Sequence, residues 1–173
     1  DMRHNQPSCH KVFGEAQAIL AGDGLQALAF GVLIRDESIE PNIRIELLKL
    51  LAISAYEMAE GQSIDLSVVS KSVDIEILNQ MHQKKTGSLI SCAVKLGALL
   101  NANIDSKDID ILDSYAHNIG LAYQVQDDVL DLSTTEEILG KRQNSDLRKG
   151  KPTYPAILGF DKSIRVYKDL YRF

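Results

Sequence analysis

The sequence predicts an all-α protein. Hydrophobic residues recur at three- and four-residue spacing along most of its 173 residues, and strand-like alternation is scarce. Proline, which interrupts helices, occurs only four times. Because 45% of the residues are hydrophobic and 25% are charged, the chain has enough apolar material for one helical bundle. We therefore assign residues 1–173 to a single domain.

Two long helices are expected in the first third of the chain. Residues 16–33 are apolar around nearly the whole helix circumference, which is typical of a helix buried either at the centre of a bundle or against a second subunit. Pro41 is well placed to begin a second helix, with Leu47 and Leu51 on its apolar face. Gly61 is expected to end this second helix.

The remaining helices are expected to alternate with loops. A short helix over residues 74–84 leads to another over residues 88–100. Ser106 begins a long helix with acidic residues in its first turns, where they complement the helix dipole. Residues 133–152 are polar and basic and contain glycine, which indicates a loop. A last helix is expected over residues 154–173.

The composition argues against nucleic-acid binding and membrane insertion, and it favours a reducing compartment. The net charge of −5 argues against general affinity for nucleic acids. Cys9 and Cys92 provide neither a disulfide framework nor a zinc spacing, so we expect a reducing, cytoplasmic setting. The longest apolar stretch, residues 16–34, is interrupted by polar residues, and we interpret it as a buried helix. No membrane insertion is therefore expected.

Three carboxylates stand in one otherwise apolar helix. Asp127, Asp128 and Asp131 follow Gln124 in a segment whose leucines and valines recur at helical spacing. Asp127 and Asp131 should point nearly the same way, with Asp128 at the edge of that face. Like charges repel at this spacing, so a buried acidic face needs a compensating cation. Mg²⁺, which takes one or two carboxylates and shares phosphate oxygens, is the natural candidate; a solvated helix edge is the alternative.

Cationic groups that could bind a magnesium-bound diphosphate occur in three places. Lys85 and Thr86 precede the helix expected at residue 88, where an ammonium, a hydroxyl and free backbone N–H groups could address phosphate oxygens. Lys141 and Lys151 are the first and last residues of a segment that contains five basic residues, these two included, and one acidic residue. Each group alone could equally be an exposed helix start or a solvated loop lysine. Their combination favours a phosphate site.

Three polar residues in the first part of the chain, Arg3, His4 and Asp23, lead to specific expectations. Arg3 and His4 pair a permanent cation with a titratable one, against the alternative of a frayed terminus. Asp23 stands in an apolar helix, so we expect it to be hydrogen-bonded or paired inside the bundle.

Other polar residues are interpreted as structural. Gln62 and Asp65 follow the expected end of a helix and are assigned as capping groups. Three histidines show no mutual spacing that indicates a metal site or a catalytic triad: His10, His82 and His117.

Six segments of the chain form an ordered set of motifs: residues 13–23, 60–66, 85–87, 120–131, 140–141 and 150–155. In this order and approximate spacing they resemble the motifs of the trans-isoprenyl diphosphate synthases. Within that family they look most like those of the bacterial farnesyl and geranyl diphosphate synthases. The resemblance runs through most of the chain.

The resemblance implies an isoprenoid synthase (terpenoid synthase) helical bundle around a central cavity, incomplete in this chain. Two aspartate-rich helices in that fold hold Mg²⁺ on an allylic diphosphate, and Asp127, Asp128 and Asp131 match the second of them as metal ligands. The matching diphosphate-binding positions are Arg3, Lys85, Thr86, Gln124, Lys141 and Lys151, of which Lys85, Thr86, Gln124 and Lys141 would be catalytic. His4 stands where a second arginine normally binds isopentenyl diphosphate, so that contact would be altered or pH-dependent.

The resemblance also implies an activity. It is the Mg²⁺-dependent condensation of dimethylallyl or geranyl diphosphate with isopentenyl diphosphate, which gives geranyl or farnesyl diphosphate, by a homodimeric enzyme. A class I terpene cyclase and a non-catalytic subunit of a heteromeric synthase are the alternatives. The first aspartate-rich motif is absent apart from Asp1, so we expect this chain to be a C-terminal portion, truncated at both ends and inactive alone.

Overall fold

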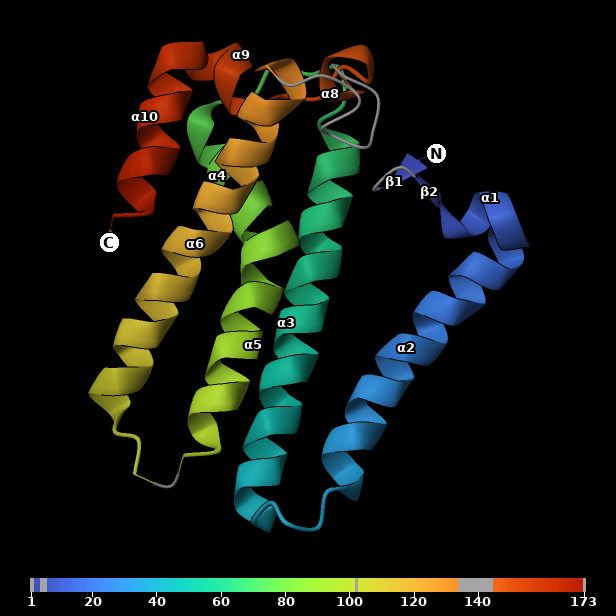
Figure 1. Ribbon diagram of the computed structural model, residues 1–173, viewed down its shortest axis with the longest axis vertical. Helices are drawn as coiled ribbons and strands as arrows, with labels where there is room; N and C mark the ends of the chain where they lie inside the picture. The colour runs from blue at the N-terminus through green and yellow to red at the C-terminus, as the bar shows by residue number, and fades with distance from the viewer. Residues whose placement is uncertain (1, 4–5, 102, 134–144, 173) are drawn as a thin grey trace.

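Helices carry the fold. The computed structural model describes residues 2–3, 6–101, 103–133 and 145–172, and of Arg3, Ser145 and Leu147 it describes only the backbone. Within these residues nearly every element is a helix (Figure 1), which confirms the prediction of an all-α protein. The exception is an antiparallel hairpin in which β1 (Met2–Arg3) pairs with β2 (Gln6–Pro7).

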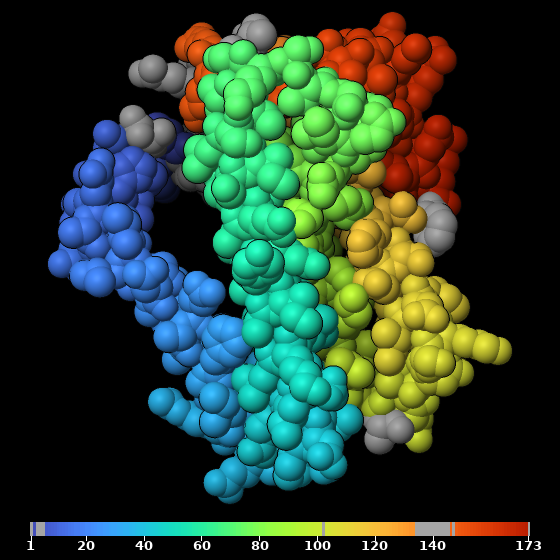
Figure 2. Space-filling model, turned by 180° about the vertical axis from the view of Figure 1, so that it is seen from behind, coloured from blue at the N-terminus to red at the C-terminus, as the bar shows by residue number. Residues whose placement is uncertain are grey.

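Two helices follow the hairpin and lie apart from most of the bundle. α1 (Cys9–Phe13) and α2 (Glu15–Arg35) meet at Gly14, whose φ of 88° suits glycine and separates the two helices. α2 approaches α3 (Pro41–Ser67) near the connection between them and diverges from it toward α1 (Figure 1). The view from behind shows open space between α2 and α3 (Figure 2).

The expected helix over residues 16–33 is confirmed, but it is not buried at the centre of the bundle that the structure describes. No residue of α2 is buried, and Ile19, Leu20 and Leu25 are each more than 60% exposed. Asp23 is also exposed rather than paired inside a core. The reason is that α1 and α3 are the main neighbours of α2 in the described part of the chain. By length and a mean hydropathy of 1.5, α2 also meets the criteria for a membrane-crossing helix.

Three long helices lie side by side and form the body of the bundle (Figure 1): α3, α5 (Ser88–Leu99) and α6 (Ser106–Ser133). The Glu40 carboxylate caps α3 by accepting hydrogen bonds from two backbone N–H groups of its first turn, and Pro41 occupies the first helical position. The Asp105 carboxylate accepts a hydrogen bond from the first turn of α6. α6 begins at Ser106 as predicted, and it continues past Asp127, Asp128 and Asp131 to Ser133.

The segment before α5 is continuous with it. α4 (Ile75–His82) passes through a π-helical turn, η1 (Gln83–Gly87), directly into α5. Lys85 and Thr86 do precede the helix that begins at Ser88, as predicted, but the free backbone N–H groups expected there are not found, because the preceding turn is itself helical. Both residues lie inside the π-helical turn, a local widening that often occurs at functional sites.

Close backbone contacts explain two glycines in this region. A Cβ on Gly61 would lie 2.2 Å from the backbone nitrogen of Lys85, and one on Gly120 would lie 2.8 Å from the Cα of Gly87. Side chains at these positions would force the helices apart, so glycine lets α3 and α6 approach η1. The prediction that Gly61 ends a helix is wrong, because α3 continues to Ser67.

We predict that Gly61→Ala lowers the free energy of unfolding by about 1–3 kcal/mol, because its new Cβ meets backbone atoms rather than a flexible side chain. Gly97 in α5 is a matched control, since a Cβ there meets nothing within 4 Å. Gly97→Ala should raise the free energy of unfolding by about 0.4–1 kcal/mol. Urea denaturation measures both changes, and equal stability of the two variants would contradict the close-contact explanation.

The C-terminal part consists of short helices. α8 (Ser145–Arg148) is followed by α9 (Tyr154–Leu158) and α10 (Phe160–Leu170), and α10 packs against α6. Gly159, with a φ of 85°, separates α9 from α10, so the single last helix predicted over residues 154–173 is in fact two. A cluster of buried apolar side chains joins α4, α6 and α9 to the end of α3: Val68, Leu78, Met81, Val125 and Tyr154.

Candidate active site

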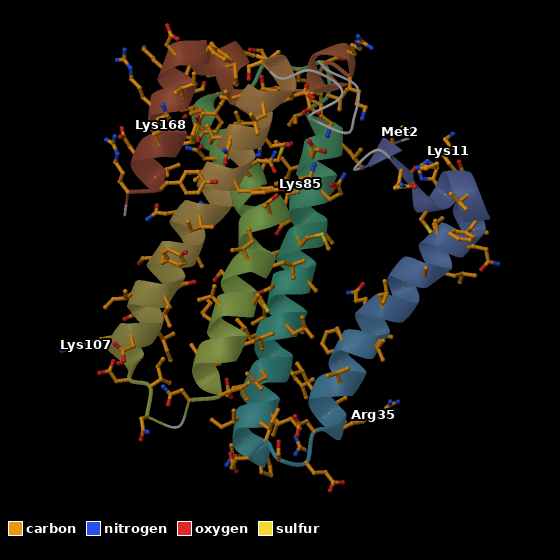
Figure 3. All side chains as sticks on the ribbon, viewed as in Figure 1. Met2, Lys11, Arg35, Lys85, Lys107 and Lys168 are labelled. Atoms are coloured by element: carbon orange, nitrogen blue, oxygen red, sulfur yellow. The ribbon has the colours of Figure 1, made fainter. Side chains whose placement is uncertain are left out.

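A cavity of about 750 Å³ opens at the end of the bundle where η1, α6 and the segment before α9 meet. Its size is in the range of small-molecule sites. Lys85 lies in this half of the bundle, at the same end as the N-terminal hairpin that carries Met2 (Figure 3). The polar side chains that line it and matter below are Asp65, His82, Lys85, Thr86, Gln124, Asp127, Asp128 and Lys151.

The three aspartates of α6 have different surroundings. Asp127 is half-buried and lines the cavity. Asp128 also lines it and is only 3% exposed; its Oδ2 accepts hydrogen bonds from the backbone N–H of Tyr154 at 3.0 Å and from the His82 ring at 3.3 Å. Asp131 is buried outside the lining, and its Oδ2 accepts a hydrogen bond from the backbone N–H of Asp146 at 3.1 Å. Of the three carboxylates, those of Asp127 and Asp128 therefore line the cavity, whereas that of Asp131 does not.

Two lysines of the cavity converge on one carboxylate of α3. The Nζ atoms of Lys85 and Lys151 lie 2.8 and 2.6 Å from the same Oδ2 of Asp65. The Asp65 side chain is 3% exposed, and the two lysine side chains are 28% and 20% exposed. Burial raises the pKa of Asp65, but the hydrogen bonds and positive charges of Lys151 and Lys85 outweigh it and hold this pKa below its ordinary value. The prediction that Asp65 caps a helix is therefore wrong. Asp65 instead forms ion pairs with both lysines.

Backbone contacts hold Lys151 in place. The backbone N–H of Ser70, just beyond α3, donates to the carbonyl oxygen of Gly150 at 2.7 Å. Gly150 has a φ of 65°, and the next N–H, that of Lys151, donates to the carbonyl of Asp146 at 3.0 Å. A segment far from Asp65 in sequence is thereby fastened to the end of the helix that carries it.

Thr86 and Gln124 form a direct pair across the cavity wall. The Thr86 hydroxyl donates to Oε1 of Gln124 at 3.0 Å, which joins η1 to α6. Both side chains are half-buried and line the cavity. The threonine hydroxyl oxygen and the glutamine NH₂ group offer further polar contacts to a bound oxygen-rich ligand.

The arrangement suits an anionic ligand with many oxygen atoms. Two lysines supply positive charge, a hydroxyl and an amide supply hydrogen bonds, and two carboxylates supply oxygen ligands for a hard cation that would bridge to the anion. In the described part of the chain, no group of three His, Cys, Asp or Glu side chains is close enough to hold a metal by itself. A cation here would therefore share its coordination with the ligand and water, which is how Mg²⁺ binds phosphates.

Comparison with known proteins decides the family. The family model described as Polyprenyl synthetase matches residues 1–172. The chain belongs to the polyprenyl synthetase family. It is 44% identical to farnesyl diphosphate synthase of Escherichia coli K12 over 98% of this chain and 58% of the relative, and 42% identical to that of Geobacillus stearothermophilus over 91% and 54%. The chain thus spans a little over half the length of these curated relatives.

Solved structures agree with this assignment. A geranyltransferase from Helicobacter pylori, complexed with magnesium and isoprenyl diphosphate, superposes with a TM-score of 0.89 at 28% identity, covering 99% of this chain and 56% of that one. The expected isoprenoid synthase fold is therefore confirmed. The match extends through α2, so we interpret α2 as a helix of the polyprenyl synthetase bundle and not as a membrane span.

Most of the predicted site residues of this polyprenyl synthetase chain come together. The cavity is lined by six of them: Lys85, Thr86, Gln124, Asp127, Asp128 and Lys151. Asp131 is buried beside that group. His4 and Lys141 lie outside the described residues, and for Arg3 only the backbone, in β1, is described.

Asp65 and His82 are among the cavity residues that were not predicted to belong to the site. Asp65 is interpreted from the sequence as a capping group and His82 as a structural histidine. Asp65 follows Gly61 by four residues and therefore shares the helix face that contacts η1, but only the structure shows this contact. His82 lies three residues before Lys85, again on a shared face, but its contact with Asp128 spans 46 residues and has no local signal.

Proposed function

We propose that this protein is a magnesium-dependent prenyltransferase of isoprenoid biosynthesis. It would condense dimethylallyl or geranyl diphosphate with isopentenyl diphosphate, giving geranyl or farnesyl diphosphate and free diphosphate. The observation that carries the proposal is one cavity, in a polyprenyl synthetase chain, lined by the carboxylates of Asp127 and Asp128 and by the ammonium groups of Lys85 and Lys151. The farnesyl and geranylgeranyl diphosphate synthases among its relatives support the reaction class.

The donor set fits Mg²⁺. Asp127 and Asp128 provide the one or two carboxylates that Mg²⁺ usually takes from a protein, and the diphosphate and water would complete the coordination. The magnesium and isoprenyl diphosphate in the related Helicobacter pylori structure support this assignment. When bound, Mg²⁺ would neutralise the negative charge that develops on the departing diphosphate.

The side chains of this chain would bind and orient the allylic substrate. Lys85 and Lys151 would move from Asp65 toward the diphosphate oxygens, while Thr86 and Gln124 would offer hydrogen bonds beside them. The buried cluster beneath the cavity, which includes Met81, would keep water from the allylic cation. Because the isopentenyl double bond is the nucleophile, no side-chain nucleophile is needed. The departing diphosphate would take the proton that the condensation releases.

The product of the complete gene tests this proposal. With Mg²⁺, dimethylallyl or geranyl diphosphate and isopentenyl diphosphate, we expect one free diphosphate for each isopentenyl unit added to the product. A diphosphate assay and mass spectrometry measure the two quantities. EDTA should abolish turnover and added Mg²⁺ should restore it. Absence of product would refute the proposal. Consumption of the allylic substrate without isopentenyl diphosphate would indicate a terpene cyclase instead.

We also propose a cytoplasmic homodimer. The exposed apolar residues of α2, such as Ile19 and Leu25, support burial against a second subunit. Light scattering on the same preparation measures its mass in solution, and a monomeric mass would refute the dimer.

A further inference from the structure

His82 occupies an unusual place for a residue without an assigned role. It is the last residue of α4, lines the cavity, and is only 3% exposed. Its Nε2 lies 3.3 Å from Oδ2 of Asp128. Its ring stacks on that of Tyr154, with centroids 5.9 Å apart and planes 12° from parallel. Its Nδ1 is buried and has no hydrogen-bond partner among the described residues.

These contacts define which ring nitrogen carries the proton. A carboxylate only accepts hydrogen bonds, so the contact with Asp128 assigns the proton to Nε2, which then donates. Nε2 is therefore the ring nitrogen through which His82 donates to Asp128.

Both hydrogen bonds to Asp128 in the described structure end on one oxygen. The Tyr154 N–H and the His82 ring both reach Oδ2. They hold the carboxylate in one rotamer, and Oδ1 is left for a ligand in the cavity. Histidine and backbone donors of this kind orient metal-ligating carboxylates in many proteins, and their loss typically weakens metal binding by about 10–100-fold.

The Tyr154 ring on which His82 stacks is itself held by a hydrogen bond. Tyr154 begins α9, and its hydroxyl donates to Oδ1 of Asn79, one turn before His82 in α4. Burial, and to a smaller extent the charge of Asp128, raises the pKa of Tyr154 to about 12, so this hydroxyl remains a donor at ordinary pH. Asn79 thus accepts from the hydroxyl of Tyr154 while His82 stacks on the face of the same ring, and of these two residues only His82 reaches Asp128.

We propose that His82 is a positioning residue that orients Asp128 to bind a divalent cation. The inference rests on the proposed function, because it assumes that Asp128 ligates Mg²⁺. It goes beyond that function by assigning to His82 a role that acts through Asp128.

Three variants of the complete protein test this role. His82→Leu removes the donor, whereas His82→Gln places an amide nitrogen within reach of the position of Nε2 and keeps it. Asn79→Ala removes the neighbouring contact to Tyr154 without touching Asp128. Mn²⁺ binding, followed by the electron paramagnetic resonance of the free ion, is measured with thermal unfolding and with the Mg²⁺ dependence of turnover.

We expect His82→Leu to bind Mn²⁺ about 10-fold more weakly and to need about 10-fold more Mg²⁺ for half-maximal turnover. His82→Gln should retain both values, and Asn79→Ala should lower the unfolding temperature without changing them. Equal Mn²⁺ binding by His82→Leu and wild type would overturn the inference, as would equal weakening in His82→Leu and His82→Gln. If the wild-type protein bound no Mn²⁺, the proposed metal site would fail first, and this inference with it.

Discussion

Replacing Asp128 with asparagine should lower kcat of the complete protein by about two to three orders of magnitude, equivalent to about 3–4 kcal/mol. The amide oxygen of asparagine can still accept the hydrogen bonds from Tyr154 and His82, so the fold should persist. The negative charge that would hold Mg²⁺ is lost. Steady-state kinetics over a range of Mg²⁺ concentrations measures the effect.

Asp113, an aspartate of α6 away from the cavity, provides the control for this prediction. Asp113 accepts hydrogen bonds from Ser91 at 2.5 Å and Lys95 at 2.8 Å, and it does not line the cavity. Asp113→Asn should leave kcat unchanged. If Asp128→Asn behaved like Asp113→Asn, a metal role for Asp128 would be excluded. Asp127→Asn should resemble Asp128→Asn, because both carboxylates line the same cavity.

The second large effect concerns stability. Asp65→Asn should lower the free energy of unfolding at pH 7 by about 3 kcal/mol, because it leaves two partly buried ammonium groups side by side without a counter-charge. The pKa of Asp65 in the folded protein is lowered, so its stabilising effect is complete above the ordinary carboxyl pKa and is lost as pH falls through the lowered value. The difference between wild type and Asp65→Asn should therefore shrink below about pH 4.

Another ion pair of α3 makes the comparison specific. The side chains of Glu60 and Lys84 lie 2.5 Å apart but are 40% and 26% exposed. Glu60→Gln should cost less than about 1 kcal/mol, because solvent screens exposed pairs. Urea denaturation at neutral and acidic pH measures both variants. A loss for Asp65→Asn no greater than that for Glu60→Gln would show that Asp65 does not anchor the two lysines.

The helices could be predicted from local sequence, but some of their ends could not. Pro41 and Ser106 begin helices as expected, because the proline and the nearby carboxylates act within one turn. Gly61 was expected to end a helix, yet it lies inside one. Glycine has two physical uses here, since it relieves strain at a helix end and it permits close backbone contact. Only the position of η1 beside Gly61 shows which use applies.

Several residues of the candidate cavity were predicted from the motifs, but its geometry was not. Lys85, Thr86, Gln124 and Lys151 come together as the ordered motifs indicated. The roles of Asp65 and His82 could not be derived, because their partners are 20 to 86 residues away in sequence. Such contacts depend on how helices cross, and helical periodicity carries no information about crossing.

The aspartates of α6 also show which features follow from local sequence and which depend on packing. Their spacing and the apolar residues between them establish an amphipathic helix with an acidic face, because side-chain direction repeats every 3.6 residues. Which two carboxylates reach the cavity depends on where α9 and α8 dock, since Tyr154 holds Asp128 and the backbone of Asp146 holds Asp131. Local periodicity thus determines the helix and its acidic face, and packing by distant segments decides which oxygens remain available for a cation.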